Sequence, residues 1–161
     1  MSHANIRPAE HLAYAQRERL AFIELRVYFC GNLTRAHIER RFGVKPAASA
    51  RDLIAYRALA PHNLQYSAAS RCYLPTKAFR PIFKHTAGHV LNWLRSGVGD
   101  GVEDISARAI PCESVHDLAE PKLDVLSTIT RAITAGTVIE VSYLSLTSGA
   151  SIKRLAPLAL A

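Results

Sequence analysis

The sequence of 161 residues predicts an α+β fold that is rich in helix and has few, short strands. Three observations predict it. Apolar residues recur at helical spacing through the first sixty residues, and two short β-prone runs follow between residues 63 and 74. Three glycines in residues 97–101 then separate this part from a second mixture of helix and strand.

A long first helix is expected over residues 10–30, which contain no Gly or Pro. Leu20, Ile23 and Val27 recur there at helical spacing, which predicts a buried face. Gly31 is suited to end this helix because glycine adopts the left-handed backbone easily.

Two shorter helices follow. Thr34 is suited to cap one that runs to Phe42, where Gly43 supplies a turn. Pro46 suits the first turn of the next helix, since its missing N–H is not needed there, and Pro61 marks its end. The core face of this third helix is expected to consist of Ala50, Leu53 and Ile54.

The next two runs, residues 63–66 and 71–74, are β-prone and are joined by small polar residues, which predicts a hairpin. Three helices and a hairpin in this order make a winged helix-turn-helix, which we assign to residues 1–80. In that fold the helix after the turn enters the major groove of DNA and exposes small or hydrogen-bonding side chains on its first turns.

The expected DNA contacts come from the third helix, the start of the second and the hairpin. They are Arg35, Lys45, Ala47, Ala48, Ser49, Arg51 and Arg71. In the third helix the basic members would reach guanine edges or phosphates, the serine either base, and the alanines a thymine methyl group. Arg35 and Arg71 would set the register through phosphates or the minor groove. Asp52 is expected to pair with a neighbouring arginine instead.

The net charge of +7 is confined to the first half of the chain. Residues 1–80 hold 13 Lys or Arg and 5 Asp or Glu (13 − 5 = +8), whereas residues 81–161 hold 7 and 8 (7 − 8 = −1). Such an asymmetry indicates a polyanionic or acidic partner. Charge alone does not separate DNA from RNA, a membrane or an acidic protein, and an ordinary solvated basic face is a further alternative.

The location of the protein is predicted from features that its sequence lacks. No apolar run approaches the roughly 18 residues of a membrane span, and the first residues do not resemble a secretory signal. We therefore expect a soluble, cytoplasmic protein. Cys30, Cys72 and Cys112 are widely separated and odd in number, which predicts reduced, buried thiols rather than disulfides.

We assign residues 81–104 to a helical dimerisation segment and linker, with a helix that begins at Pro81. The broad apolar face of this helix predicts the contact surface of a homodimer. The alternative is that it packs on the first helix of the same chain. The expected dimer contacts are Phe83, Val90, Trp93 and Leu94.

Residues 105–161 are typical of a small domain that contains β-strands. The expected elements are a strand at 105–110, a helix at 121–135 closed by Gly136, a strand at 138–146 and another from Ile152 onward.

Two parts of the sequence resemble known domains. Phe42-Gly43-Val44 followed by Arg51-Asp52-Leu53 resembles the winged helices of bacterial repressors, although Lys45 stands where a Ser or Thr cap is common and Ser49 where an aliphatic core residue is common. The second half resembles the opening of a WYL domain. The residues that carry this second resemblance are Tyr143-Leu-Ser145, Ser148-Gly149 and Arg154-Leu-Ala-Pro157.

Taken together, the chain resembles the WYL-domain transcription regulators of the CapW and BrxR type, which are repressors of phage-defence operons. The resemblance implies a homodimer bound to an inverted-repeat operator, with a nucleotide or nucleic-acid effector sensed by the WYL domain. The Trp-Tyr-Leu signature of that domain is not in the sequence, so we expect its truncated beginning. The implied ligand contacts are Tyr143, Ser145, Ser148 and Arg154. The alternative function is a winged-helix protein-interaction or RNA-binding module of a larger assembly.

An enzyme is not expected. His85 and His89 have the i, i+4 spacing of zinc ligands on a helix, but no Glu stands between them and the nearest further ligands lie beyond residues 97–101. We expect a surface histidine pair, no metal and no cofactor. The sequence also lacks the glycine-rich phosphate loop and the nucleophile elbow of common enzyme classes.

Overall fold

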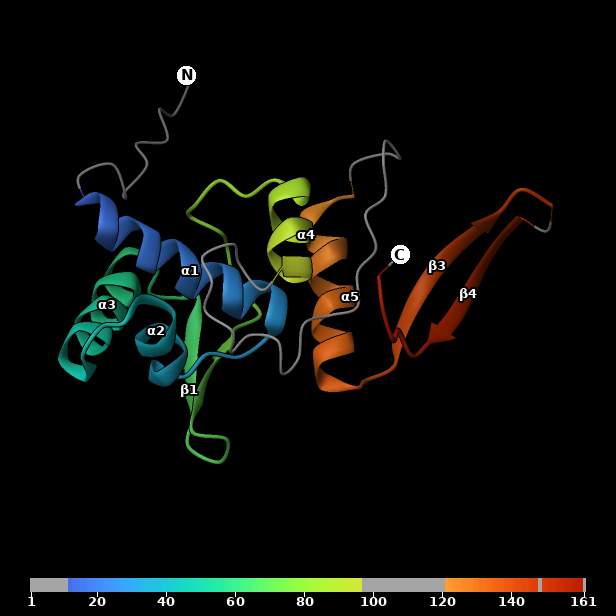
Figure 1. Ribbon diagram of the computed structural model, residues 1–161. Helices are drawn as coiled ribbons and strands as arrows, with labels where there is room; N and C mark the ends of the chain where they lie inside the picture. The colour runs from blue at the N-terminus through green and yellow to red at the C-terminus, as the bar shows by residue number, and fades with distance from the viewer. Residues whose placement is uncertain (1–11, 97–120, 148, 161) are drawn as a thin grey trace, which may run out of the picture. The chain divides into compact units, whose positions relative to one another are not determined.

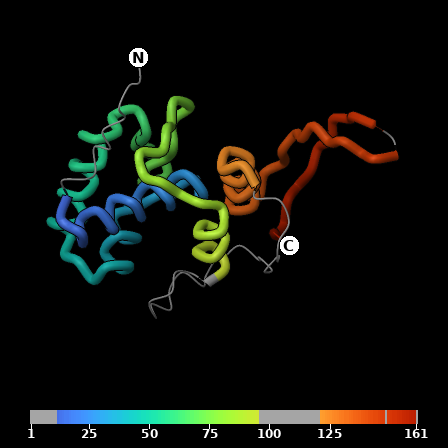
Figure 2. The backbone as a smooth tube through the Cα atoms, turned by 90° about the horizontal axis from the view of Figure 1, so that it is seen from above, coloured from blue at the N-terminus to red at the C-terminus, as the bar shows by residue number. Residues whose placement is uncertain are grey.

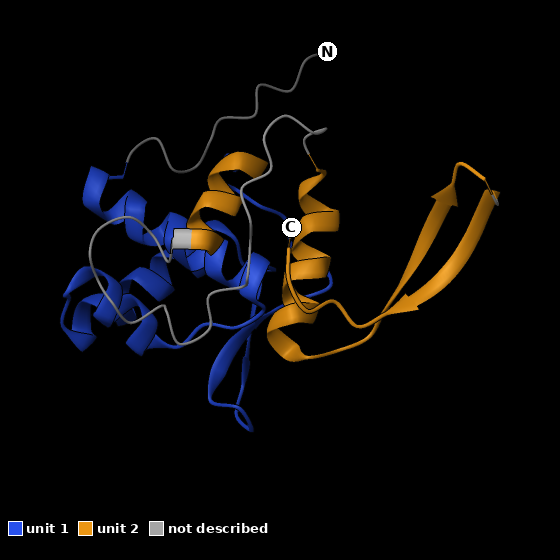
Figure 3. Ribbon diagram, turned by 45° about the vertical axis from the view of Figure 1, so that its right-hand side comes forward, with its two compact units in different colours: residues 1–85 blue, residues 86–161 orange. Residues whose placement is uncertain are grey.

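The computed structural model describes residues 12–96, 121–147 and 149–160, with nine helices and strands (Figure 1). Contacts divide the chain into two compact units, residues 1–85 and residues 86–161 (Figure 3). The architecture is α+β and rich in helix, as predicted.

The first unit contains three helices and one antiparallel hairpin. They are α1 (Tyr14–Cys30), α2 (Arg35–Phe42), α3 (Pro46–Leu59), β1 (Leu64–Ser67) and β2 (Cys72–Pro75). Helices α2 and α3 both pack against α1, and β2 also contacts α1 (Figures 1 and 2). The predicted order of three helices and a hairpin is confirmed.

The β1–β2 hairpin, called the wing below, is held beside the helices by the chain just before α2. Within the wing, Tyr66 faces Tyr73 across the strands. Leu33 and Tyr73 exchange two backbone hydrogen bonds, of 2.9 and 2.7 Å, so that the start of α2 is fixed to β2. This link brings the N-terminus of α2 next to the wing.

Glycines end the first two helices where the sequence predicted them. Gly31 and Gly43 have φ angles of 78° and 62°, in the left-handed region that a side chain disfavours. The turn at Gly43 places α3 across α2, and Pro46 occupies the first turn of α3.

The core of the first unit forms around α1. The aliphatic and aromatic side chains with no exposed surface are Leu20, Ile23, Val27, Phe29, Leu33, Ile38 and Tyr56. The three residues predicted to form the buried face of α1 are among them.

The buried face of α3 differs from the predicted one. Leu53 is buried and Ala50 half-buried, but Ile54 is 69% exposed. The buried positions of α3 are Ser49, Asp52, Leu53 and Tyr56, an i, i+3, i+4, i+7 pattern that includes two polar residues. The expectation that Ile54 belongs to the core was wrong because α3 is turned so that these two polar residues face inward.

Both polar residues on the buried face of α3 have partners on other helices. Asp52, 2% exposed, accepts two hydrogen bonds from the Arg19 guanidinium, of 2.6 and 3.2 Å. Ser49, with no exposed surface, donates to a Glu39 carboxylate oxygen at 2.6 Å. These bonds fix the rotation of α3 about its axis and hence the residues that it exposes. The predicted pairing of Asp52 with an arginine is confirmed, but the partner, Arg19, lies 33 positions earlier rather than beside it in the sequence.

A buried carboxylate holds the end of the first unit. Glu24 of α1 has no exposed surface and accepts hydrogen bonds from the Tyr56 hydroxyl, the backbone N–H groups of Ile82 and Phe83, and His85 Nε2, all within 2.8–2.9 Å. We call these residues and Asn63 the Glu24 network. Four donors compensate the cost of burying the charge.

Asn63 extends this network to the chain after the wing. Its side-chain amide donates to the Tyr56 hydroxyl and to the Arg80 carbonyl oxygen, and its side-chain oxygen accepts the Arg80 backbone N–H. Burial is the largest cause that raises the pKa of the Tyr56 phenol, so this hydroxyl remains protonated and donates to Glu24.

The helix predicted from Pro81 begins later. The helix α4 spans Ala87–Ser96, and in the non-helical chain before it the N–H groups of Ile82 and Phe83 donate to Glu24. His85 therefore precedes the helix, is buried and pairs with Glu24, whereas His89 is exposed on α4. The expected surface pair of histidines was wrong.

The second unit contains α4, a further helix and a second hairpin. The helix α5 (Leu123–Ala135) ends at Gly136, and the strands β3 (Ile139–Ser145) and β4 (Gly149–Leu155) pair in antiparallel register. These elements match the predicted helix and strands, with β4 beginning earlier than expected. The strand predicted at 105–110 lies outside the described residues.

Three of the four expected dimer contacts are buried in the single chain. They are Val90, Trp93 and Leu94, whereas Phe83 is half-buried. A dimer formed through these side chains stays a prediction, and the isolated chain does not expose most of them.

Cys30 is half-buried and Cys72 buried, and both are free thiols. Cys112 lies outside the described residues. Burial raises the pKa of the Cys30 thiol to about 11. Among the helices in the described ranges, none is long and apolar enough to cross a membrane.

Candidate nucleic-acid interface

The start of α2 carries an exposed arginine, and a histidine holds the backbone of the capping residue just before it. Arg35 is the first residue of α2, and His37 Nδ1 accepts the backbone N–H of Thr34 at 3.1 Å and Arg26 Nε–H at 3.0 Å. Because Nδ1 accepts, the neutral ring carries its proton on Nε2. The histidine thus takes the place that Glu or Gln has in a capping box.

Protonation of His37 would break this arrangement. Burial, and after it the charges of Arg26 and Arg40, together lower the pKa of His37 from 6.5 to about 4. A proton on Nδ1 would remove the acceptor and place a third positive charge beside two arginines. The start of α2 is therefore set for a neutral ring at physiological pH.

This pKa predicts the effect of acid on stability. The unfolded chain binds a proton at His37 near pH 6.5, and the folded chain only near pH 4. The stability that this difference contributes is complete above pH 6.5 and is lost progressively as the pH falls from 6.5 through 4. Because the ring is half-buried, we expect a loss on the order of 1 kcal/mol. His37→Gln keeps a capping acceptor but does not titrate, so urea denaturation at pH 7 and pH 4.5 should show a smaller acid loss than in the wild type. His62→Gln, at an exposed histidine, is the control and should leave the loss unchanged.

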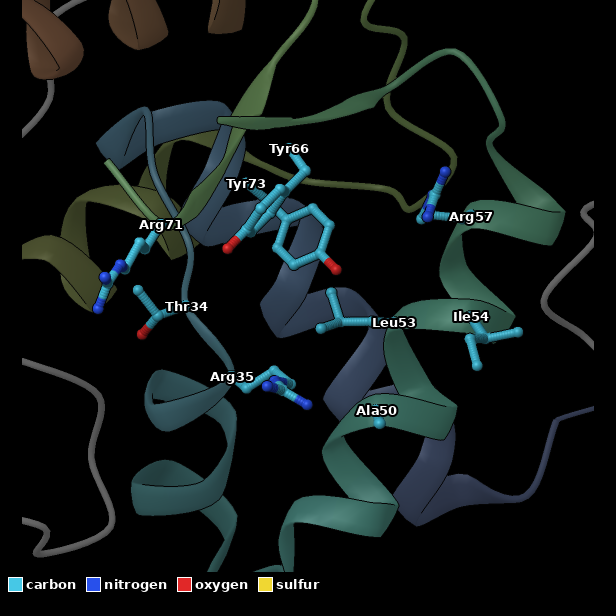
Figure 4. Close-up of a pocket in the computed structure, with 9 residues that line it drawn as sticks. All are labelled: Thr34, Arg35, Ala50, Leu53, Ile54, Arg57, Tyr66, Arg71 and Tyr73. Carbon is cyan, nitrogen blue, oxygen red and sulfur yellow. The ribbon is translucent and has the colours of Figure 1, made fainter. Parts of the chain in front are cut away.

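A hollow of about 390 Å³ lies between the start of α2, the middle of α3 and the wing. It is lined by Thr34, Arg35, Ala50, Leu53, Ile54, Arg57, Tyr66, Arg71 and Tyr73 (Figure 4). Three of these residues are arginines and none is acidic. The hollow is therefore a place for an anionic group or chain.

The three arginines come from three different elements. Arg35 begins α2, Arg57 lies in the last turns of α3, and Arg71 stands in the turn of the wing. All three are exposed, and Figure 4 shows Arg57 and Arg71 on opposite sides of the hollow. Arg71 has a φ of 51°, a left-handed conformation that is uncommon for a residue with a side chain.

The tyrosines form the wall of the hollow on the side of the wing. The rings of Tyr66 and Tyr73 meet edge to face at 5.2 Å between centroids. In Figure 4 the two rings lie beside each other, with one hydroxyl group pointing toward Leu53 of α3 and the other toward the side of Thr34 and Arg71. Their hydroxyl groups are hydrogen-bond donors that suit phosphate oxygens.

The first turns of α3 present most of the residues predicted for base contacts. Lys45, Ala47 and Arg51 are exposed and Ala48 is half-buried. The predicted contact from Ser49 is wrong, because its hydroxyl is buried and bonded to Glu39. Its burial agrees with the aliphatic core residue that is common at this position in winged helices of bacterial repressors.

Sequence reasoning missed Ile54, Arg57, Tyr66 and Tyr73. Arg57 was detectable as a basic residue six positions after the exposed Arg51 on the same helix. The alternation along each strand shows which face of the wing the tyrosines occupy. That this face lines a hollow together with α3 is a contact between distant residues, which the sequence does not show. Ile54 was assigned to the wrong face of its helix.

The described residues bring no metal ligands together. Among them, no group of three or more His, Cys, Asp and Glu side chains is placed to hold a metal ion. His85 is engaged by Glu24 and is not available as a ligand.

The residues proposed for ligand binding do not form one cluster in the β3–β4 hairpin. Tyr143 and Ser145 lie on one face, whereas Arg154 faces Glu140 across the strands and so lies on the other. The amine of Lys153 lies 4.2 Å from the centroid of the Tyr143 ring. Ser148 lies outside the described residues.

Comparison with protein families supports the winged helix. Residues 15–96 match the family model described as the BrxR transcriptional regulator winged helix-turn-helix domain. The matched stretch is about half of the chain and extends from α1 through α4, so it includes the whole hollow.

Three similar curated proteins are each named DNA-binding transcriptional repressor CapW. The one from Escherichia coli strain KTE188 is 30% identical over 88% of this chain and 49% of its own length. Those from Stenotrophomonas maltophilia and Pseudomonas aeruginosa are 30% and 29% identical, each over 83% of this chain and 46% of their own length. The chain thus spans about half the length of the curated relatives it matches.

Proposed function

Because this chain belongs to the BrxR family of transcriptional regulators, whose winged helix-turn-helix domain it contains, we propose that it is a repressor that binds duplex DNA. The observation that carries this proposal is the basic hollow between α3 and the wing. The similar proteins named CapW are DNA-binding transcriptional repressors, which supports the same role here.

In this proposal the exposed face of α3 lies in the major groove and the wing lies over the neighbouring minor groove. One sugar–phosphate strand separates these grooves, so it passes along the hollow. Arg35, Arg57 and Arg71 stand where they would meet its phosphates. Phosphate contacts of this kind fix register and orientation without reading sequence.

Sequence would be read by α3. Lys45 and Arg51 are exposed on its first turns and would reach guanine edges, while Ala47 and Ala48 allow close approach and contact with thymine methyl groups. The bonds of Asp52 and Ser49 to other helices hold this face toward the groove. Binding, rather than catalysis, is the activity we propose.

The regulator as a whole would work as a homodimer in the cytoplasm. Two copies would place their recognition helices about 34–36 Å apart, or a multiple of that distance, on an inverted-repeat operator. The resemblance to CapW-type and BrxR-type repressors supports a role in a phage-defence operon. We assign sensing of a nucleotide or nucleic-acid effector to the WYL-like part, with Tyr143 and Ser145 as the first residues to test.

The proposal is tested by binding to duplex DNA selected from a random library, compared with a scrambled duplex at two salt concentrations. Arg51→Ala is expected to cost about 1–3 kcal/mol on the selected duplex and to relax the preference at one base pair. Arg95→Ala, at an exposed arginine of α4, should leave both affinity and preference unchanged.

Two results would argue against this function. Equal binding to the selected and scrambled duplexes, with a steep salt dependence, would favour an RNA-binding or interaction module. An Arg51→Ala variant that keeps the full preference would show that α3 does not read the bases through this side chain.

A further inference from the structure

Ile54 is the one large aliphatic side chain that is exposed in residues 12–85, the part of the first unit that the structure describes. It is 69% exposed and lies in the third turn of α3. Single exposed apolar residues are normal on protein surfaces, so exposure alone says little. Its surroundings are what set it apart.

These surroundings are basic. Ile54 lines the same hollow as Arg35, Arg57 and Arg71, and Figure 4 shows it on the outer side of α3. The aliphatic side chain of Ile54 neither donates nor accepts a hydrogen bond, so it adds nothing to the electrostatic attraction of phosphates. Its contribution must come from removing apolar surface from water.

Duplex DNA offers few apolar partners to such a side chain. In the major groove the one apolar group on a base edge is the C5 methyl of thymine. The small side chains of Ala50 and Ala47, one and two turns earlier, do not block the approach of α3 to the groove. Sugar faces are the other apolar surface, but they are the same in every sequence.

We propose that Ile54 contacts a thymine methyl group and thereby selects an A·T base pair at one position of each bound site. The inference rests on the proposed binding to duplex DNA and names a specificity-determining residue for it. It adds an aliphatic contact from the third turn of α3 to the contacts expected from its first turns.

The test is a double-mutant cycle that removes the thymine methyl group and the Ile54 side chain, singly and together. The duplex most enriched from a random library by the full chain is remade with each thymine replaced, one at a time, by deoxyuridine, which lacks only the methyl. At one position the wild type should lose about fourfold in affinity, the effect of leaving about one methyl group unburied. Ile54→Ala should bind the original duplex about fourfold more weakly and show no further loss at that position.

Matched variants separate the contact from folding. Ile54→Val keeps the branched methyl groups next to the backbone and should keep most of the sensitivity to deoxyuridine. Because Ile54 is exposed and alanine favours helices, Ile54→Ala should melt at the wild-type temperature or above it. Tyr14→Ala, at an exposed residue of α1, should bind every duplex as the wild type does.

The outcomes distinguish this inference from the function on which it rests. If no sequence is enriched over the random library, the proposed function and the inference fall together. If a sequence is enriched but holds no thymine whose methyl couples to Ile54, the inference alone is overturned. Equal weakening of all duplexes by Ile54→Ala would indicate a contact with sugars and would also overturn it.

Discussion

Replacement of Glu24 with alanine is expected to lower the free energy of unfolding by about 3–5 kcal/mol, the usual cost of removing one partner from a buried charged pair. Four donors converge on this carboxylate, and each would be left buried without its acceptor. Small domains are stable by about 5–15 kcal/mol, so the variant would retain only part of its stability. Urea denaturation followed by circular dichroism measures the change.

Two further variants make this prediction decisive even if the alanine variant does not fold. Glu24→Gln keeps the size and one oxygen acceptor but introduces an amide donor among donors, so a smaller loss is expected. Glu18→Ala changes an exposed residue of the same helix and should cost little. Equal stabilities of the Glu24→Gln and Glu18→Ala variants and the wild type would contradict the role assigned to the Glu24 network.

The largest expected effect on binding comes from removing two arginines of the hollow together. The double variant Arg35→Ala with Arg71→Ala should bind the selected duplex about a hundredfold more weakly, taking about 1.4 kcal/mol for each phosphate contact. The slope of the logarithm of affinity against the logarithm of salt concentration should become shallower by about two. The scrambled duplex should lose as much, since phosphates carry no sequence information.

Fluorescence anisotropy titrations at several salt concentrations give both quantities. Arg95→Ala combined with Lys122→Ala removes two exposed charges from the second unit and is the matched control for net charge. A salt slope reduced equally by both double variants would mean that general charge, rather than the hollow, determines the binding.

Local features of the sequence predicted most of the elements. Glycines at 31, 43 and 136 ended helices as expected, since glycine takes left-handed backbone without steric cost. The wing was predicted because its two runs are adjacent in the chain and pair with each other. Such predictions depend on residues a few positions apart, which the sequence shows directly.

Contacts between distant residues explain what was missed. Ser49 was placed among the DNA contacts because its partner, Glu39, lies 10 positions earlier, and the partner of Asp52, Arg19, lies 33 positions earlier. With those two positions turned inward, Ile54 turns outward. The rotation of α3 therefore depended on pairings that periodicity alone does not contain.

The same limit applies to the start of α4. Ile82, Phe83 and His85 hydrogen-bond Glu24 across 58 to 61 positions of sequence, in the segment where the predicted helix would have begun. Hydrophobic periodicity does not show that a distant carboxylate will bind two backbone N–H groups. The hollow itself was predicted only in part, through Arg35 and Arg71.

The Glu24 network also determines how the first unit comes apart. It joins α1, α3, the residue before the wing and the non-helical segment after the wing. If one of these parts detached, buried hydrogen bonds of the network would be broken. Chain ends and loops usually open locally at little cost. Here the segment at residues 80–85 is expected to open only together with α1 and α3, so that these three parts unfold as one cooperative unit.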